Sequence, residues 1–193
     1  MQENQERGGF LGEMKINNFQ TDLEYSLLER ENIIFNNFYY RVFPGLEHIE
    51  IVNFNTDFGK KLQKSGVDKI LCFKSGYTLS IDEKKRREVY SDILLETWSV
   101  WEKRIRGWLY TCQCEYIVYV KMPIRKIYLL PVFLLKSVWM KNGLLWLNKY
   151  KNITAKNNGY VTKSVAIPDE ILLTAIKEQM TTEFLEEDIY YSK

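Results

Sequence analysis

The chain has 193 residues, of which 46% are hydrophobic and 27% are charged, and its formal net charge is +2. This length and balance predict one globular domain with a substantial core. The small net charge excludes a polycationic chain, so any nucleic-acid surface must be local. No apolar run approaches a membrane span, and the polar residues 1–7 do not resemble a signal peptide. Three cysteines fit a reducing compartment, and we therefore expect a cytoplasmic protein without membrane contact.

The N-terminal region divides into a polar segment and a helix. Residues 1–18 are polar and contain glycine, and we expect a flexible segment there, followed by a single domain over residues 19–193. A capping-box pattern begins at Thr21 and predicts a helix that runs to about Val42.

Two glutamates of this predicted helix, Glu24 and Glu31, fall on the same arc as its apolar residues. A carboxylate on a core-facing arc is costly unless another group pairs with it. Glu24 is explained equally well as part of the capping box. Glu31 is explained more simply by a salt bridge at the rim of the helix.

Three strands are predicted after the helix. The first covers residues 50–54, and residues 57–64 form a polar connection. Two apolar runs, 67–74 and 77–84, then flank a turn at Ser75-Gly76, which indicates a β-hairpin.

The hairpin brings two acids and a lysine together. Asp68 lies near the start of its first strand, and Asp82 and Lys84 lie at the end of its second, so these ends are adjacent in an antiparallel pair. Converging carboxylates repel each other unless a cation lies between them, and oxygen ligands beside a lysine suit Mg²⁺ and a phosphate. Because side chains alternate along a strand, Asp82 and Lys84 share a face and Glu83 points to the other. Asp82 is therefore the preferred metal ligand, and Glu83 is the alternative if the strand end twists.

The second half of the chain predicts further strands and two helices. Residues 92–96 form either a strand or the start of a helix. The other expected elements are strands over 114–120 and 126–130, a helix over about 132–146, and a final helix opened by Pro168.

The cysteines and the single histidine suggest a weaker alternative. Cys112 and Cys114 would need Cys72 and His48 to complete a zinc site, and small buried residues in a strand explain the pair more simply. One histidine without a nucleophile motif argues against Ser–His and Cys–His catalysis. The sequence also contains no glycine-rich phosphate-binding motif.

Two clusters of basic residues are candidates for contacts with a phosphate backbone. They comprise Lys85, Arg86 and Arg87 after the hairpin, and Lys103, Arg104 and Arg106 further on. The alternative is a solvated basic turn. Trp98, Trp101 and Trp108 lie around the second cluster. Their rings could stack on unpaired bases, but core packing is the favoured interpretation.

The hairpin motif resembles that of the PD-(D/E)XK nuclease superfamily, in which an acid on one strand and an acid-x-lysine on the next bind a catalytic metal. Val67 stands where the name of the motif has proline. The order helix, strand, strand, strand is also that of the superfamily core. Further phrases resemble small endonucleases of phages and mobile elements; they lie at residues 66–71, 81–84, 92–96, 107–108, 116–119 and 128–131.

The resemblance implies an α/β restriction-endonuclease-like fold, with a mixed central sheet flanked by helices. It implies hydrolysis of DNA with Mg²⁺ or Mn²⁺, with Asp68 and Asp82 as ligands and Lys84 as the catalytic lysine. It makes Glu24 or Glu31 a candidate helix acid, and Glu96 a further candidate acid. Glu96 is otherwise a half-buried carboxylate paired with an arginine.

The alternative function is a protein of the same fold that binds nucleic acid or a partner protein without cutting, such as a recombination accessory or a mobile-element regulator. The sequence does not distinguish DNA from RNA as substrate. It is compatible with a homodimer.

Overall fold

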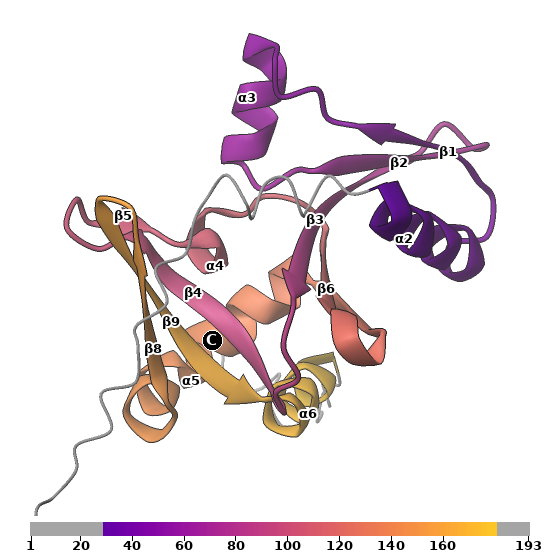
Figure 1. Cartoon of the computed structure of the whole chain (residues 1–193). Coiled ribbons are helices and arrows are strands. Elements are labelled where there is room, and N and C mark those ends of the chain that lie inside the picture. Colours follow the sequence, from indigo (N-terminus) through magenta and orange to yellow (C-terminus); the bar gives the residue numbers. More distant parts are fainter. Residues whose placement is uncertain (1–28, 181–193) are drawn as a thin grey trace, which may run out of the picture.

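The computed structural model describes residues 29–180 (Figure 1). The helices are α2 (Glu29–Val42), α3 (Asp57–Lys64), α4 (Trp108–Thr111), α5 (Val132–Lys149) and α6 (Asp169–Met180), with a short 3₁₀ turn at Met122–Ile124. The strands are β1 (Leu46–Ile51), β2 (Lys69–Phe73), β3 (Thr78–Arg86), β4 (Asp92–Val100), β5 (Ile105–Arg106), β6 (Tyr116–Lys121), β7 (Lys126–Pro131), β8 (Asn152–Asn157) and β9 (Tyr160–Pro168).

One sheet has five strands in the order β1-β2-β3-β6-β7. All neighbouring pairs are antiparallel except β3 and β6, which are parallel. In that parallel pair Asp82 lies opposite Ile117 and Glu83 lies opposite Val118. Because directly opposed residues share a face of a sheet, this register fixes which side of the sheet each candidate residue occupies.

A second sheet of four antiparallel strands has the order β5-β4-β9-β8. Glu96 of β4 pairs with Ser164 of β9, and the register of this pair shifts between Glu96 and Trp98. Such a bulge bends a strand locally and redirects its side chains.

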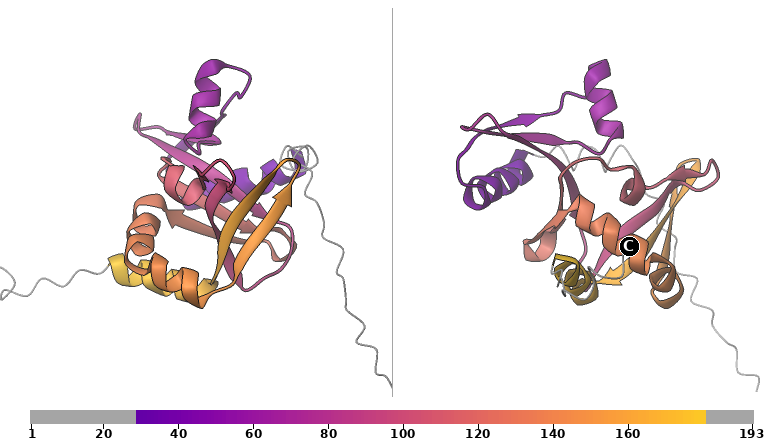
Figure 2. Two further views of the ribbon diagram at one scale, coloured as in Figure 1. Left: turned by 90° about the vertical axis from the view of Figure 1, so that its left-hand side faces the viewer. Right: turned by 180° about the vertical axis from the view of Figure 1, so that it is seen from behind.

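The connection between the parallel strands β3 and β6 contains β4, β5 and α4. Parallel neighbours need a long crossover, and here the crossover contributes the start of the second sheet. Figure 1 shows β3 and β4 diverging from their connecting turn beside α6, with β3 running toward β2 and β4 toward β9. Figure 2 shows that α3 projects from the rest of the molecule, while its Leu62 packs against the hydrophobic core.

The two faces of the five-stranded sheet pack against different hydrophobic cores. The smaller core lies between the sheet and α2, and contains Phe35, Tyr39, Leu71, Ile81, Val118 and Val120. The larger core joins the opposite face to α5, α6 and the second sheet, and includes Ile93, Leu95, Ile117, Leu135, Val165, Ile167 and Leu172. Asp82 shares its face with Ile117, and it therefore points between the two sheets.

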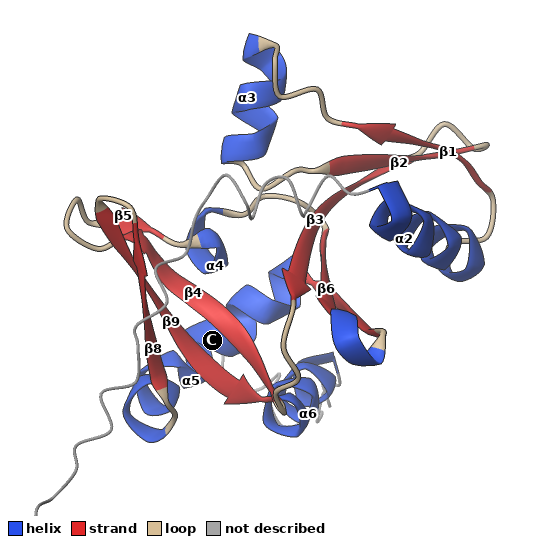
Figure 3. Cartoon of the chain, in the orientation of Figure 1, coloured by secondary structure: helices blue, strands red, loops and turns tan. Residues whose placement is uncertain are grey.

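The predicted hairpin, helices and several strands are confirmed, as Figure 3 shows. The turn between β2 and β3 contains Gly76 with φ +81, a conformation that glycine adopts without strain. Strand 50–54 is found slightly earlier, as β1, and residues 92–96 belong to a strand rather than a helix. The capping box at Thr21 and the predicted flexible segment 1–18 lie outside the described residues.

The prediction of a polar connection over residues 57–64 is wrong, because this segment is α3. Thr56 caps the helix by accepting a hydrogen bond from the Gly59 backbone N–H at 2.9 Å. The strands β8 and β9 were not predicted. Their turn at Asn158-Gly159, with φ +84 at Gly159, is a strong sequence signal for a hairpin.

These findings establish a mixed α/β architecture in which a five-stranded mixed sheet is flanked by helices. None of the helices within residues 29–180 is both long enough and apolar enough to cross a membrane.

Candidate metal centre

Strand β3 carries Asp82 and Lys84 on the face that points between the two sheets. Asp82 is 1% exposed, and the Lys84 Nζ lies 2.6 Å from Asp82 Oδ1. The Lys84 side chain keeps 30% of its surface exposed. The pair therefore joins a buried carboxylate to a lysine whose side chain is partly exposed.

Asp68 lies beside this pair, as the hairpin geometry predicted. Its backbone N–H donates to the Ile81 carbonyl at 2.8 Å, which extends the β2–β3 pairing by one residue. Its carboxylate Oδ2 accepts a hydrogen bond from the Glu83 backbone N–H at 2.9 Å. The backbone of β3 therefore fixes the position of this second carboxylate.

The two carboxylates influence each other's charge. Burial raises the pKa of Asp82 to about 6; Lys84 opposes this shift, and the nearby Asp68 reinforces it. Burial alone would lower the pKa of Lys84, but Asp82 and Asp68 outweigh it and raise that pKa above its ordinary value. The site therefore keeps the Lys84 ammonium protonated, and the Asp82 carboxyl loses its proton at a higher pH than an ordinary aspartate.

The second oxygen of Asp82, Oδ2, is buried and has no hydrogen-bond partner among the described residues. Gly66, with φ +71, lies next to it, and a Cβ at this position would be 3.3 Å from Asp82 Oδ2 and 3.0 Å from Cys112 Sγ. A buried carboxylate oxygen without a donor, next to a second carboxylate, fits a divalent cation with oxygen ligands. Asp68 and Asp82 would hold such an ion.

Glu96 of β4 approaches the same site from the second sheet. Its Oε1 accepts a hydrogen bond from the Trp108 backbone N–H at 3.2 Å. Burial raises the pKa of Glu96, while the Trp108 N–H and the Lys84 ammonium lower it. The Trp108 ring lies 5.9 Å from Lys84 Nζ. The Trp108 backbone therefore holds Glu96, whereas the alternative interpretation of the sequence had paired this carboxylate with an arginine.

Gly107 makes this approach of β4 and α4 possible. A Cβ on Gly107 would lie 2.4 Å from the Glu96 carbonyl oxygen and 2.7 Å from the Glu96 Cγ. Only glycine leaves room for the backbone at this distance. The sequence did not indicate that Gly107 and Trp108 would hold Glu96, because this contact depends on a tertiary approach that no local pattern records.

Glu83 points to the opposite face of β3, as the alternation of side chains predicted. Its Oε1 lies 2.7 Å from Lys69 Nζ and accepts a hydrogen bond from the Tyr39 hydroxyl at 2.7 Å. Burial and Glu83 together raise the pKa of Tyr39. The structure does not bring Glu83 to Asp68 and Asp82, so the strand-end twist considered for Glu83 does not occur.

The helix acids could not be placed at this site. Glu24 lies outside the described residues, and Glu31 lies in α2 but its side chain is also outside what the structure describes.

Within residues 29–180, the one group of three candidate ligand atoms that lie within 4.8 Å of each other belongs to His48, Glu50 and Cys72. This group lies at the surface, on β1 and β2. Cys112 and Cys114 lie elsewhere, with their sulfur atoms 3.0 Å apart. The four-ligand zinc arrangement of the cysteines and His48 is therefore not assembled.

The first basic cluster is directed into the protein more than the sequence suggested. An Arg86 NH1 atom lies 2.7 Å from Asp92 Oδ1 and donates to the Tyr119 hydroxyl at 3.3 Å. Lys85 Nζ lies 5.0 Å from the Phe35 ring centre. Arg87 is exposed. Arg86 therefore links β3 to β4 through its ion pair with Asp92, and its side chain is only 12% exposed.

The second basic cluster is exposed at the β4–β5 turn. Lys103, Arg104 and Arg106 are all exposed, whereas Trp98 and Trp101 are half-buried. The core interpretation is thus confirmed for Trp108, which packs against the larger core, but not for Trp98 and Trp101, whose rings contact surface arginines.

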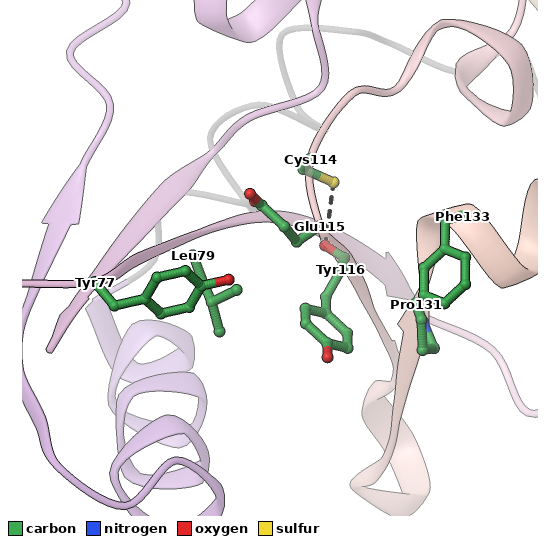
Figure 4. A pocket seen from close by; sticks show the side chains of 7 residues that line it. All are labelled: Tyr77, Leu79, Cys114, Glu115, Tyr116, Pro131 and Phe133. Carbon is green, nitrogen blue, oxygen red and sulfur yellow. Dashed lines mark hydrogen bonds between the residues drawn. The ribbon is translucent and has the colours of Figure 1, made fainter.

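A separate pocket of about 280 Å³ lies between the β2–β3 turn and the start of α5 (Figure 4). It is lined by Tyr77, Leu79, Cys114, Glu115, Tyr116, Pro131 and Phe133. None of the predicted site residues lines it.

Neither a family model, nor a curated protein, nor a solved structure matches the chain. Functional assignment therefore depends on the geometry of the site.

Proposed function

We propose that this protein is a metal-dependent nuclease that hydrolyses DNA phosphodiester bonds with Mg²⁺ or Mn²⁺, on a restriction-endonuclease-like fold. One observation carries the proposal. Asp82 is buried next to a second carboxylate, and its Oδ2 has no donor within the described residues, while Lys84 holds the other oxygen. Two acids that share a space without enough positive charge are a site for a divalent cation.

The roles of the residues follow from their positions. Asp68 and Asp82 would hold the ion, which when bound lowers the pKa of a water molecule and offsets charge on the phosphate. Lys84 has an exposed portion next to this ion site and would orient the attacking water or stabilise developing negative charge. Glu96 would accept a proton or assist the ligands from the β4 side.

The order of elements supports the finer fold assignment. A helix precedes three antiparallel strands, and the third of these strands pairs in parallel with a later one. Asp68 lies one residue before the second strand, and the acid-x-lysine lies on the third. This is the placement that the superfamily resemblance implies.

A second candidate function is a non-catalytic protein of this fold that binds nucleic acid or a partner. One observation favours it. Within the described residues, no third acid has a carboxylate oxygen that forms, with oxygens of Asp68 and Asp82, a group whose members all lie within 4.8 Å of one another. A site with two acids and a lysine can bind a cation weakly without catalysing hydrolysis.

The test is cleavage of plasmid, single-stranded DNA and RNA in the presence of Mg²⁺ or Mn²⁺. We expect wild-type protein to cut DNA, Asp82→Asn to lose cleavage, and Lys84→Ala to lose about 10²–10³ in rate. Glu83→Gln is the matched control, because it removes the neighbouring acid on the opposite face of the strand. Circular dichroism verifies that each variant is folded.

Wild-type protein that binds DNA but cuts neither DNA nor RNA would support the non-catalytic candidate. Cleavage that persists equally in Asp82→Asn and Lys84→Ala would exclude this site as the catalytic centre. Cleavage of RNA alone would retain the site and change the substrate.

A further inference from the structure

A row of cations and aromatic rings crosses the second sheet near the β4–β5 turn. Arg106 lies 4.1 Å from the Trp98 ring centre, and Arg104 lies 4.3 Å from that of Trp101. Lys163 of β9 lies 3.2 Å from the same Trp101 ring centre. The two tryptophan rings meet edge to face at 5.3 Å. We call Arg104, Arg106 and Lys163, with these two rings, the cation row.

The register of the sheet explains why these residues meet. Trp98 of β4 lies opposite Arg106 of β5 on one side and opposite Lys163 of β9 on the other. Neighbouring strands are about 4.8 Å apart, and directly opposed side chains point to the same face. Three strands therefore present the row on one face, and the β4–β5 turn adds Trp101 and Arg104.

The charges of the cation row are not balanced by acids. The structure records no ion pair between Arg104, Arg106 or Lys163 and any residue in the range 29–180, in contrast to Arg86 with Asp92. Glu102, the acid in the same turn, accepts a hydrogen bond from the Val161 backbone N–H at 3.0 Å. Uncompensated cations on one face produce a local positive potential despite the small net charge of the chain.

The rings hold the cations in place and are not free to stack on bases. Trp101 is in contact with both Arg104 and Lys163, and Trp98 is in contact with Arg106 and with Trp101. Stacking on an aromatic face restricts a guanidinium while leaving its outer N–H groups available. Arginine in this state binds phosphate oxygens in pairs, which favours a phosphate backbone over unpaired bases as the ligand.

One member of the cation row, Trp98, lies on the strand that carries Glu96. Trp98 is two residues beyond Glu96, which at about 3.3 Å per residue places it roughly 7 Å further along β4. Glu96 is close enough to Lys84 for the ammonium to lower its pKa. A strand bound at the acid site could thus continue onto the row without crossing another element of the second sheet.

We propose that the cation row binds the phosphate backbone of the nucleic acid next to the segment that occupies the acid site. This names a second contact region for the substrate and adds Lys163, which no motif indicated. The proposal rests on the proposed function in one respect: the bound nucleic acid is called a substrate because we propose that the protein cleaves it. Backbone binding by the row does not require cleavage.

The test measures binding of labelled duplex and single-stranded 30-mers by fluorescence anisotropy, with EDTA present so that nothing is cut. We expect Arg104→Gln/Arg106→Gln to bind duplex about tenfold more weakly at low salt, because charge-assisted hydrogen bonds are lost. The slope of log affinity against log salt should become shallower by about 1.8, since two phosphate contacts are removed. Lys163→Gln alone should change the slope by about 0.9.

Lys141→Gln/Lys149→Gln is the matched control, because it removes two exposed cations from α5, outside the row. It should bind like wild type. Trp101→Leu keeps every charge and removes a ring, so weaker binding with an unchanged salt slope would show that the ring positions the cations. If Trp101→Leu does not fold, Arg104→Lys gives the same comparison, because it keeps the charge and loses the flat guanidinium.

The proposal is overturned if Arg104→Gln/Arg106→Gln binds like wild type across the salt series, or if both double variants lose affinity equally. Unchanged affinity of Trp101→Leu would overturn the role of the rings. Failure of the nuclease proposal looks different, since wild type would then bind through the row without cutting in Mg²⁺ or Mn²⁺. If Arg104→Gln/Arg106→Gln both binds and cleaves DNA like wild type, the cation row does not bind the backbone, and the nuclease proposal is unaffected.

Discussion

Strand β3 contributes to an acid–lysine pair on each of its faces, one completed by Lys69 of β2 and the other lying within β3 itself, and the two pairs differ in their surroundings. Glu83 pairs with Lys69 at 2.7 Å on the face toward α2, and Asp82 pairs with Lys84 at 2.6 Å on the face toward the second sheet. The four charged groups are adjacent in the sheet, and both acids are buried. Their ion-pair distances do not separate a structural pair from a functional one.

The surroundings of the pairs do separate them. The Glu83–Lys69 pair is closed: Tyr39 donates to Glu83, and Lys69 lies 5.3 Å and 5.6 Å from the ring centres of Phe35 and Tyr39. The Asp82–Lys84 pair is open, because Asp82 Oδ2 has no donor in the described part of the chain and Lys84 reaches solvent. A neighbouring like charge and a partly exposed lysine therefore distinguish the Asp82–Lys84 pair better than burial does.

The largest expected effect on stability comes from breaking the closed pair. Glu83→Ala leaves the Lys69 ammonium buried without its carboxylate, and we expect a loss of about 3–5 kcal/mol in the free energy of unfolding. Urea denaturation of the metal-free protein measures this. Asp82→Ala should cost much less, since Lys84 can turn to water, and an equal loss in both variants would remove the distinction between the pairs.

The second prediction concerns pH. Burial raises the pKa of Asp82 from 3.8 to about 6, so the folded protein holds this proton more tightly than the unfolded chain does. The stabilisation is therefore complete below pH 4 and is lost as pH rises through about 6. The loss is about 3 kcal/mol, measured as the difference in unfolding free energy between wild type and Asp82→Asn without metal. A pH-independent difference would show that Asp82 does not titrate in this range.

The third prediction adds the cation. Mg²⁺ or Mn²⁺ at about 100 times its Kd should stabilise the folded protein by about 2.7 kcal/mol, because the ion binds the native state. Differential scanning fluorimetry should show the shift in wild type and in any folded Glu83→Gln protein, but not in Asp82→Asn. A shift of equal size in Asp82→Asn would place the bound ion elsewhere, and the surface group of His48, Glu50 and Cys72 would be the first position to examine.

The smallest expected effect follows from replacing the closed pair by apolar groups. The triple variant Glu83→Leu/Lys69→Met/Tyr39→Phe removes both charges and the hydroxyl together, so no partner is left unsatisfied. We expect its unfolding free energy to lie within about 1–2 kcal/mol of wild type, because buried ion pairs are often replaceable. DNA cleavage should persist in this variant, since the acids on the other face of β3 are unchanged. Loss of cleavage in a stably folded triple variant would connect the closed pair to the site.

The placement of the acids could be predicted because it depends on local rules. The hairpin follows from two apolar runs around Gly76, and strand alternation then sends Asp82 and Glu83 to opposite faces. The convergence of Asp68 with Asp82 follows from antiparallel pairing. None of these steps needs contacts from elsewhere in the chain.

The partners of the basic residues could not be predicted in the same way. Arg86 and Arg106 have the same charge and similar sequence surroundings, but Asp92 balances Arg86, whereas Arg106 lies on Trp98. Glu96 meets the Trp108 backbone because Gly107 permits a close approach of the chain. The partners of these side chains depend on how the two sheets are placed relative to each other, and a single sequence does not predict that placement.

The pairing of β4 with β9 has a consequence for how the protein reaches its native state. Glu96 and Ser164 are direct partners although they are 68 positions apart in the sequence, and Lys163 joins the same ladder. Contacts between such distant segments are formed slowly, because a long loop must close first. During synthesis β4 emerges well before its partner, and until β9 arrives it presents an unpaired strand edge to other chains. We therefore expect truncation before residue 160 to favour aggregation over a smaller folded protein.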